Sequence, residues 1–315
     1  MRASDRPTTH LGASAKHFLP VDFPAVYVVS VWLVEAGEKA MTPPSSADTK
    51  FAGSIPAIYD AYLVPMFFEP YAADLANRVR AMSASRILEI AAGTGALTRA
   101  LAAATPAETA IVATDLNPAM LDRAAANGTS RSVEWRQADA MQLPFPDGAF
   151  EIAVCQFGAM FFPDKARAFA EVRRVLAPGG AFVFNVWGPL ADNEFTDVAT
   201  AALATIFPAD PPRFMARTPH GYHDPRVVER DLANGGFTGA PEIATVDARS
   251  RAASARIAAV ALCEGTPLRN EIEARDPARL GEATAAAEAA LARRFGSGAI
   301  EGRMRAHVVI ATAPG

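Results

Sequence analysis

Short apolar runs alternate with segments of helical spacing through the middle of the chain. The runs carry β-branched or aromatic residues and are too short for helices, so we interpret them as buried strands. They are RILEIA (86–91), AIVATD (110–115), SVEWRQAD (132–139), FEIAVCQF (150–157) and AFVFNVW (181–187). Helices are expected between them, at 95–104, from the Asn117-Pro118 start onward, and at 164–176, where APGG (177–180) ends the helix.

Strands that alternate with helices predict a parallel sheet, because each parallel connection needs a crossover. This unit occupies residues 84–188. Beyond it, the pattern predicts helices at 192–206, 225–234, 252–264 and 277–295, and two late strands at 242–248 and 305–313. The expected fold is α/β: a doubly wound, mainly parallel, seven-stranded sheet with an antiparallel edge strand.

Two segments precede the sheet. From Ser54 to Arg80 the apolar positions recur at helical spacing. Before them, the run FPAVYVVSVWLV (23–34) is too short to cross a bilayer, which takes about 20 apolar residues, and Pro24 interrupts it. A signal peptide fits poorly because the segment before the run is long and Pro20 and Pro24 interrupt it. We expect residues 1–40 to be a disordered or non-native extension upstream of a start at Met41.

Composition and charge narrow the function classes. The 315 residues carry a formal net charge of -4 with no long basic block, which argues against a nucleic-acid partner. Cys155 and Cys263 are the only cysteines, so neither a disulfide framework nor a cysteine zinc site is expected. The one histidine cluster, at 220–223, has too few ligands for a metal. These features favour a cytoplasmic protein without a membrane span.

Acidic residues stand at the ends of three successive predicted strands. Glu89 lies just before the turn at Gly93 and Gly95, Asp115 ends the second strand and Asp139 the third. A dinucleotide-binding turn has a third glycine, where this chain has Thr98, and an acid such as Glu89 would repel a pyrophosphate. Carboxylates suit ribose hydroxyls, an adenine amino group and a cation. Together they predict a pocket for a cationic adenosine, S-adenosylmethionine.

Four segments carry a family resemblance. ILEIAAGTGALT, ATDLNPAML, ADAMQLPFPDGAFEIAV and EVRRVLAPGGAFVFNVW resemble the successive motifs of class I S-adenosylmethionine-dependent methyltransferases. The chain is most similar to the small-molecule branch that includes the ubiquinone/menaquinone C-methyltransferases, over residues 84–188 and, in FAGSIPAIYDAYLVP (51–65), at that branch's N-terminal helix. The resemblance implies a Rossmann-like fold and S-adenosylmethionine as the cofactor.

The resemblance also implies which residues bind the cofactor. The methionine end would be lined by Glu89, Ala91, Gly93 and Gly95. Asp115 would hold the ribose, with Leu116 and Met120 against the adenine. Asp139 and Ala140 would contact the adenine edge, and Gln156 and Phe157 would close the floor. Ala91 is a departure, because the family usually has glycine there.

The reaction itself predicts the remaining parts. Methyl transfer is an in-line displacement, which mainly requires that the nucleophile be held about 3 Å from the methyl carbon in a site without water. We expect a single domain over 41–315, with a helical lid (41–83), the cofactor-binding core (84–188), and substrate-side helices, including an insert at 190–235, before the final strands (189–315).

No residue stands out as a dedicated base. Tyr59 in the lid and His223 are the candidates for a catalytic role, Tyr59 also as a contact of the cofactor. The methyl acceptor is expected to be a small, partly apolar molecule. Two alternatives stay open at this point: a non-catalytic S-adenosylmethionine-binding protein, and an NAD-dependent dehydrogenase.

Overall fold

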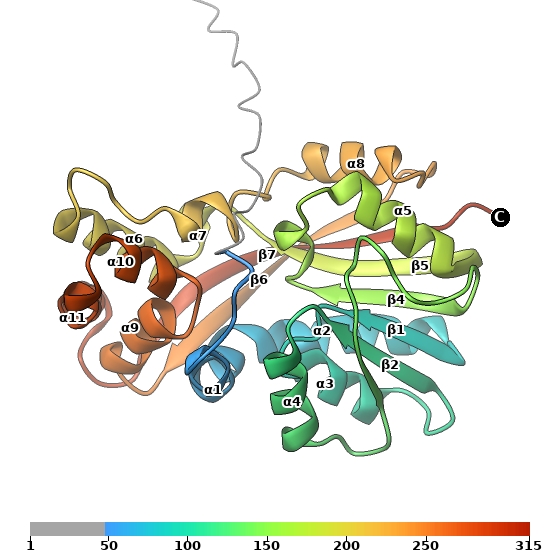
Figure 1. Ribbon diagram of the computed structural model, residues 1–315, viewed down its shortest axis with the longest axis horizontal. Coiled ribbons are helices and arrows are strands. Elements are labelled where there is room, and N and C mark those ends of the chain that lie inside the picture. Colours follow the sequence, from blue (N-terminus) through green and yellow to red (C-terminus); the bar gives the residue numbers. More distant parts are fainter. Residues whose placement is uncertain (1–47) are drawn as a thin grey trace, which may run out of the picture. The chain divides into compact units, whose positions relative to one another are not determined.

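A seven-stranded sheet forms the centre of the computed structural model, which describes residues 48–315 (Figure 1). In order across the sheet the strands are β3 (Glu134–Gln137), β2 (Ala110–Asp115), β1 (Arg86–Ile90), β4 (Phe150–Gln156), β5 (Leu176–Trp187), β7 (Ile300–Thr312) and β6 (Glu242–Ala252). The first five are parallel, and β7 runs antiparallel between β5 and the edge strand β6. The predicted fold class is confirmed. The expectations for residues 1–40 lie outside the described residues.

Helices cover both faces of the parallel strands because their side chains alternate in direction. On β1, Ile87 packs in one cluster with Leu75 and Leu101, whereas Leu88 packs in another with Phe169. The helices on the Ile87 face are α2 (Glu69–Met82) and α3 (Ala96–Ala104), and those on the opposite face are α5 (Lys165–Val175) and α8 (Pro225–Asn234) (Figure 1).

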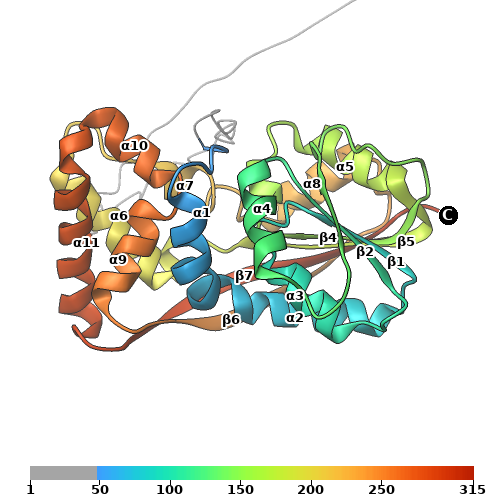
Figure 2. The ribbon, with the colours of Figure 1, turned by 60° about the horizontal axis from the view of Figure 1, so that its bottom comes forward.

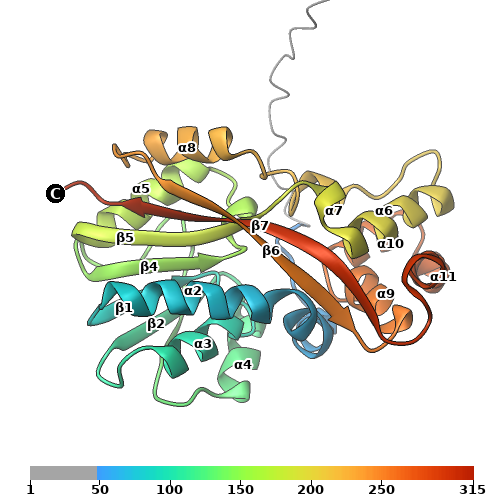
Figure 3. The same ribbon diagram turned by 180° about the vertical axis from the view of Figure 1, so that it is seen from behind.

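A second group of helices gathers where β6 and β7 extend beyond the other strands (Figures 1 and 3). Its members are α6 (Glu194–Ile206), α7 (Phe214–Arg217), α9 (Ala255–Glu264), α10 (Leu268–Arg275) and α11 (Leu280–Phe295). Helices α6 and α11 pack through Phe195 and Phe295, whose ring centroids are 5.1 Å apart. None of the helices within residues 48–315 has the length and apolar character that a membrane crossing would require.

The helical segment before the sheet contains a π-helix. Residues 55–82 form α1 (Ile55–Ile58), a π-helix over Tyr59–Phe68, and α2. Pro65 lies inside the π-helix, and the N–H of Glu69 donates to the carbonyl of Val64, five residues back. Proline lacks an N–H and clashes with the carbonyl four residues before it, so the wider turn accommodates it. The expected helix is therefore present but not regular.

The start of β5 and the helix α10 differ from the sequence expectations. Helix α5 ends at Val175 as predicted, but APGG belongs to the start of β5, where the register with β4 shifts. A Cβ at Gly180 would lie 2.8 Å from the carbonyl oxygen of Glu151, so glycine lets the two strands approach closely there. Helix α10 was not anticipated, since its polar sequence has a weak apolar face.

The turn between β1 and α3 depends on Gly95. This residue is the N-cap of α3 with φ of +82°, and a Cβ would lie 3.1 Å from Cβ of Ala124 and 3.2 Å from Cη2 of Trp135. We expect Gly95→Ala to lower the free energy of unfolding by about 1–2 kcal/mol. Gly281→Ala, in open space in the first turn of α11, should change it by less than about 1 kcal/mol and in the stabilising direction. Urea unfolding measures both, and equal losses would contradict the assignment.

Candidate functional site

A cavity opens at the carboxyl ends of β1, β2 and β4, the edge at which doubly wound sheets bind ligands. It contains about 930 Å³ of space free of protein atoms, part of it open to solvent. Its lining residues are Thr49, Phe51, Tyr59, Ile90, Ala91, Gly93, Asp115, Leu116, Asn117, Met120, Ala138, Asp139, Ala140, Met141, Gln156, Phe157, Gly158, Phe161, Phe162 and Pro163. We refer to it as the acidic cavity, after Asp115 and Asp139.

The structure brings most of the predicted cofactor residues together in the lining of the acidic cavity. Those that line the acidic cavity are Tyr59, Ala91, Gly93, Asp115, Leu116, Met120, Asp139, Ala140, Gln156 and Phe157. Glu89 and Gly95 are not among the lining residues. Glu89 is in β1 and Gly95 is the N-cap of α3, so they stand on either side of the turn that contributes Ala91 and Gly93 to the cavity.

Asp115 connects the turns that follow β1 and β2. Its Oδ2 accepts a hydrogen bond from the N–H of Gly93 at 2.9 Å, and its Oδ1 accepts one from the N–H of Asn117 at 2.8 Å. Burial raises the pKa of this carboxyl, while these two N–H groups oppose the shift. Asn117 holds the predicted N-cap position of α4 (Pro118–Asn127), but its side chain contacts Asp115 rather than the helix.

The β1–α3 turn requires backbone with positive φ. The φ angle is +56° at Ala91, +58° at Gly93 and +82° at Gly95. Such a φ costs a residue with a Cβ on the order of 1–2 kcal/mol, so Ala91 is strained where the family usually has glycine. Gly158, which the sequence analysis missed, provides the space: a Cβ there would lie 2.5 Å from Cβ of Ala91 and 2.7 Å from Sγ of Cys155.

Glu89 is a buried acid with an unpaired oxygen. Its side chain is 1% exposed, and Oε2 has no hydrogen-bond partner among the described residues. Burial raises the pKa of Glu89 to about 8, and the nearby Asp115 adds to the shift. The carboxyl is therefore mostly protonated at pH 7, and a cation bound nearby would favour its ionised form.

Other residues of the cavity lining combine apolar side chains with Asp139. Leu116 is 49% exposed, one of two large apolar side chains exposed among the described residues. Met120 is buried, and its Cε faces Gly93. Oδ1 of Asp139 accepts a hydrogen bond from the N–H of Met141 at 2.9 Å. The wall thus offers apolar surface next to a carboxylate held by the backbone.

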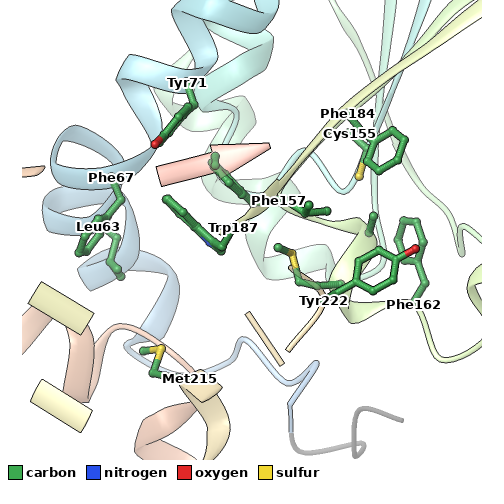
Figure 4. Close-up of a cluster of buried hydrophobic side chains, with 14 of the residues drawn as sticks. Leu63, Phe67, Tyr71, Cys155, Phe157, Phe162, Phe184, Trp187, Met215 and Tyr222 are labelled. Atoms are coloured by element: carbon green, nitrogen blue, oxygen red, sulfur yellow. The ribbon is translucent and has the colours of Figure 1, made fainter. Parts of the chain in front are cut away.

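The floor is held in a strained conformation at the end of β4. Phe157 has a φ of +50°, and its N–H donates to Oδ1 of Asn185 at 2.8 Å. Its ring stacks on Trp187 with centroids 3.8 Å apart and planes 8° from parallel (Figure 4). Nε2 of Gln156 donates to the carbonyl of Phe68 at 2.7 Å, which ties the floor to the end of the π-helix. Strain that neighbouring contacts enforce is common at functional sites.

A second, apolar cavity adjoins the first, and we call it the aromatic pocket. It contains about 600 Å³ of space free of protein atoms. Its lining residues are Phe51, Tyr59, Leu63, Phe67, Phe68, Phe157, Phe161, Trp187, Asn193, Thr196, Phe214, Met215, Pro219, His220, Leu262, Thr266 and Pro267. Four of these also line the acidic cavity, namely Phe51, Tyr59, Phe157 and Phe161. The two spaces therefore share an aromatic wall.

Tyr59 belongs to that shared wall. Its ring stacks on Phe68 at 5.0 Å and meets the edge of Phe51 at 5.9 Å. Burial, with smaller contributions from Asp115 and Asp60, raises the pKa of its phenol, which stays protonated at neutral pH. The π-helix that contains Tyr59 is attached to α4, because Asp60 accepts hydrogen bonds from Arg123 and Asn127. Figure 2 shows α1, which leads into the π-helix, next to α4.

The histidines are not placed as the sequence analysis weighted them. His220 lines the aromatic pocket, whereas His223 lines neither cavity. Nδ1 of His223 instead lies 2.6 Å from the carbonyl oxygen of His220. Loop residues of this kind give no periodic signal, so the sequence could not distinguish the two. In residues 48–315 no three His, Cys, Asp or Glu side chains cluster as metal ligands would.

The cysteines are buried and unreactive. Neither Cys155 nor Cys263 is in a disulfide, and burial raises the pKa of each thiol to about 12. Cys155 thus packs as a small buried residue of the core.

The hydrogen-bonding groups that line the acidic cavity fit an adenosine-bearing cation better than a pyrophosphate. The N–H of Gly93, which a dinucleotide-binding turn would offer to phosphate, already donates to Asp115. Among the lining residues, the carboxylates of Asp115 and Asp139 remain as acceptors for hydroxyls and an amino group. Glu89, which does not line the cavity, adds a buried carboxyl with an unpaired Oε2 in the strand before the turn.

Comparison with known proteins supports this assignment. A methyltransferase-domain family matches residues 88–184. The demethylmenaquinone methyltransferase of Thermus thermophilus is 32% identical over 192 residues, which are 56% of this chain and 87% of that protein. The enzyme of the same name from Deinococcus radiodurans is 35% identical over 130 residues, 41% of this chain and 54% of the relative. The chain thus matches little more than half the length of that second relative.

Solved structures agree at the level of the fold. The [4+2]-cyclase SpnF aligns with a TM-score of 0.52 at 19% identity, over 87% of this chain and 99% of that one. A phosphoethanolamine N-methyltransferase of Haemonchus contortus, in complex with S-adenosyl-L-methionine, aligns with a TM-score of 0.52 at 14% identity, over 83% and 56%. The matching family and the relatives above lead to one conclusion: the chain belongs to the class I S-adenosylmethionine-dependent methyltransferases.

Proposed function

We propose that this protein transfers a methyl group from S-adenosylmethionine to a small, partly apolar molecule bound in the aromatic pocket. The observation that carries the proposal is the wall that the two cavities share, formed by Phe51, Tyr59, Phe157 and Phe161. One cavity has acidic and backbone groups suited to a cationic adenosine, and the other is almost wholly apolar. Because the same four side chains line both cavities, the cavities adjoin there, and a donor in one can meet an acceptor in the other, as displacement requires.

Each acidic residue has a separate role in this proposal. Asp115 holds the ribose hydroxyls, Asp139 and Ala140 contact the adenine edge, and Leu116 with Met120 covers the ring. Glu89 and the turn through Ala91 and Gly93 hold the methionine end. When bound, the cofactor supplies a methyl carbon already activated by its sulfonium. The chain therefore has to position the acceptor against that carbon and keep water out of the site.

The aromatic pocket supports an apolar acceptor. Most of its lining is aromatic or aliphatic, and none of its lining residues is charged at neutral pH. The relatives are named for the methylation of demethylmenaquinone, which is consistent with such an acceptor. A cytoplasmic location and the division into lid, core and substrate-side helices stay predictions.

Calorimetry and turnover test the proposal together. The protein should bind S-adenosylmethionine and S-adenosylhomocysteine and should not bind NAD. With labelled cofactor and a metabolite extract it should release S-adenosylhomocysteine and label a small molecule. Tight NAD binding without heat from the adenosyl ligands would overturn the proposal. Binding without turnover on any acceptor would instead favour a non-catalytic binding protein.

Replacement of Asp115 should weaken cofactor binding. Asp115→Asn removes the charge and one of the two acceptors that hold the Gly93 and Asn117 N–H groups. We expect about 10- to 100-fold weaker binding of S-adenosylhomocysteine, or about 1.4–2.8 kcal/mol. Asp122→Asn, an exposed position on the neighbouring helix α4, is the matched control and should leave binding unchanged. Equal affinities for the two variants, with unchanged melting temperatures, would remove Asp115 from the site.

Glu89 should make the stability of the cofactor-free protein depend on pH. Its pKa rises from 4.5 to about 8 in the folded state, so the folded chain holds a proton that the unfolded chain releases. Stability from this group is complete below about pH 4.5 and falls as pH rises towards 8, by at most about 1.4 kcal/mol per unit. Glu89→Gln should flatten that fall. Urea unfolding at pH 5.5, 6.5 and 7.5 measures it, and parallel slopes in both proteins would contradict the buried, protonated carboxyl.

Tyr59 should matter through its ring. Tyr59→Ala opens the shared wall to water and should lower turnover at saturating cofactor at least tenfold, whereas Tyr59→Phe keeps the ring and should retain most of it. His223→Ala should change turnover less than tenfold, under about 1.4 kcal/mol of barrier, because His223 lines neither cavity. Assays between pH 6 and 9 with an identified acceptor decide this. A collapse in the His223 variant, with Tyr59→Ala nearly normal, would reverse the assignment.

A further inference from the structure

The aromatic pocket contains few polar side chains, and most of them are already paired. Asn193 donates to the carbonyls of Gly188 and Pro189 and accepts from the N–H of Arg305. The hydroxyl of Thr266 donates to the carbonyl of Leu262 and accepts from the N–H of Leu268. Because Asn193 and Thr266 already form these hydrogen bonds within the chain, they are poorly suited to bind a ligand. What remains is His220, with the hydroxyls of Tyr59 and Thr196, which can each donate or accept.

The hydrogen bond of His220 fixes its tautomer. Nδ1 lies 2.9 Å from the carbonyl oxygen of Gly188, and a carbonyl can only accept, so Nδ1 carries the proton. Burial lowers the pKa of His220 to about 4, and the neighbouring His223 adds to the shift. The ring is therefore neutral at pH 7, and Nε2 presents a lone pair.

Within residues 48–315, the lone pair of Nε2 accepts no hydrogen bond. The side chain of His220 is 4% exposed, it lines the aromatic pocket, and Nε2 forms no hydrogen bond with any residue from 48 to 315. Nε2 is thus an acceptor without a partner in this part of the chain, on a residue that lines the pocket. A ligand that brings a donor to this point replaces solvent with a hydrogen bond, and one that lacks a donor leaves Nε2 unpaired.

The rest of the lining restricts what that ligand can be. Phe157 and Trp187 stack nearly parallel and form a flat aromatic surface (Figure 4). The centroid of the Trp187 ring is 5.9 Å from that of His220. No lysine, arginine, aspartate or glutamate is among the lining residues that the structure describes. An anionic or cationic ligand would thus be desolvated without a counter-charge, which is unfavourable.

We propose that the aromatic pocket binds a flat, neutral aromatic methyl acceptor through a hydroxyl group that donates a hydrogen bond to Nε2 of His220. This inference rests on the proposed function, because the ligand is a methyl acceptor only if the protein transfers a methyl group. His220 is a specificity residue here: it selects ligands that carry a hydroxyl and fixes how they lie against the Phe157 and Trp187 rings.

The test uses 2-naphthol and naphthalene as probes, a pair that differs only in the hydroxyl. Calorimetry at pH 7 on the whole chain should show naphthol bound about tenfold tighter than naphthalene, the worth of one hydrogen bond to a buried acceptor. His220→Phe keeps the aromatic lining and should abolish the preference. His223→Phe is the matched control and should keep it. S-adenosylhomocysteine should bind all three proteins alike.

A second measurement needs no variant. Nitrogen-15 spectra of histidine-labelled protein should show His220 neutral at pH 7, with the proton on Nδ1, and naphthol should shift its Nε2 resonance.

Three results would overturn the inference: equal affinity of the wild type for both probes, an unchanged hydroxyl preference in His220→Phe, or a protonated Nε2 in the free protein. Loss of S-adenosylhomocysteine binding in the wild type is a separate result. It would reject the proposed function, while the probe pair would still report on His220.

Discussion

The carboxylate of Asp115 joins the two turns on which the site is built. By accepting the N–H groups of Gly93 and Asn117, it fixes the chain leaving β1 against the chain leaving β2. The hydrogen bonds also keep both oxygens at the cavity wall, in a position that burial alone would disfavour for a charge. Removal of this one group would loosen the turn and expose the N–H donors together.

The strained backbone around the floor follows from the same close approach. Ala91 and Phe157 both have positive φ, and Gly158 lies against Ala91 without a Cβ. Asn185 holds the N–H of Phe157, and the side chain of Gln156 reaches the carbonyl of Phe68. The floor of the acidic cavity, the stacked Phe157–Trp187 pair and the end of the π-helix are thus mechanically connected. Because Phe157 lines both cavities, a displacement of the floor would alter the shape of each of them.

The two cavities are built by different means. The acidic cavity uses residues within a few positions of strand ends, where the fold itself brings them together. The aromatic pocket takes residues from the π-helix, from β5, from the loop before α8 and from α9, which are far apart in the sequence. Such a surface changes without disturbing the sheet, so relatives with one cofactor site can serve different acceptors.

The sequence by itself determined the parallel sheet, its strand positions and the two acidic residues that line the acidic cavity. Alternating apolar runs and helices specify that topology, and Asp115 and Asp139 follow strands whose carboxyl ends must meet at one edge. Only the tertiary structure decided that Glu89 is buried and protonated, that APGG starts β5, and that His220 rather than His223 faces the aromatic pocket. Burial, tautomer and pocket lining depend on contacts between distant segments, which no local spacing records.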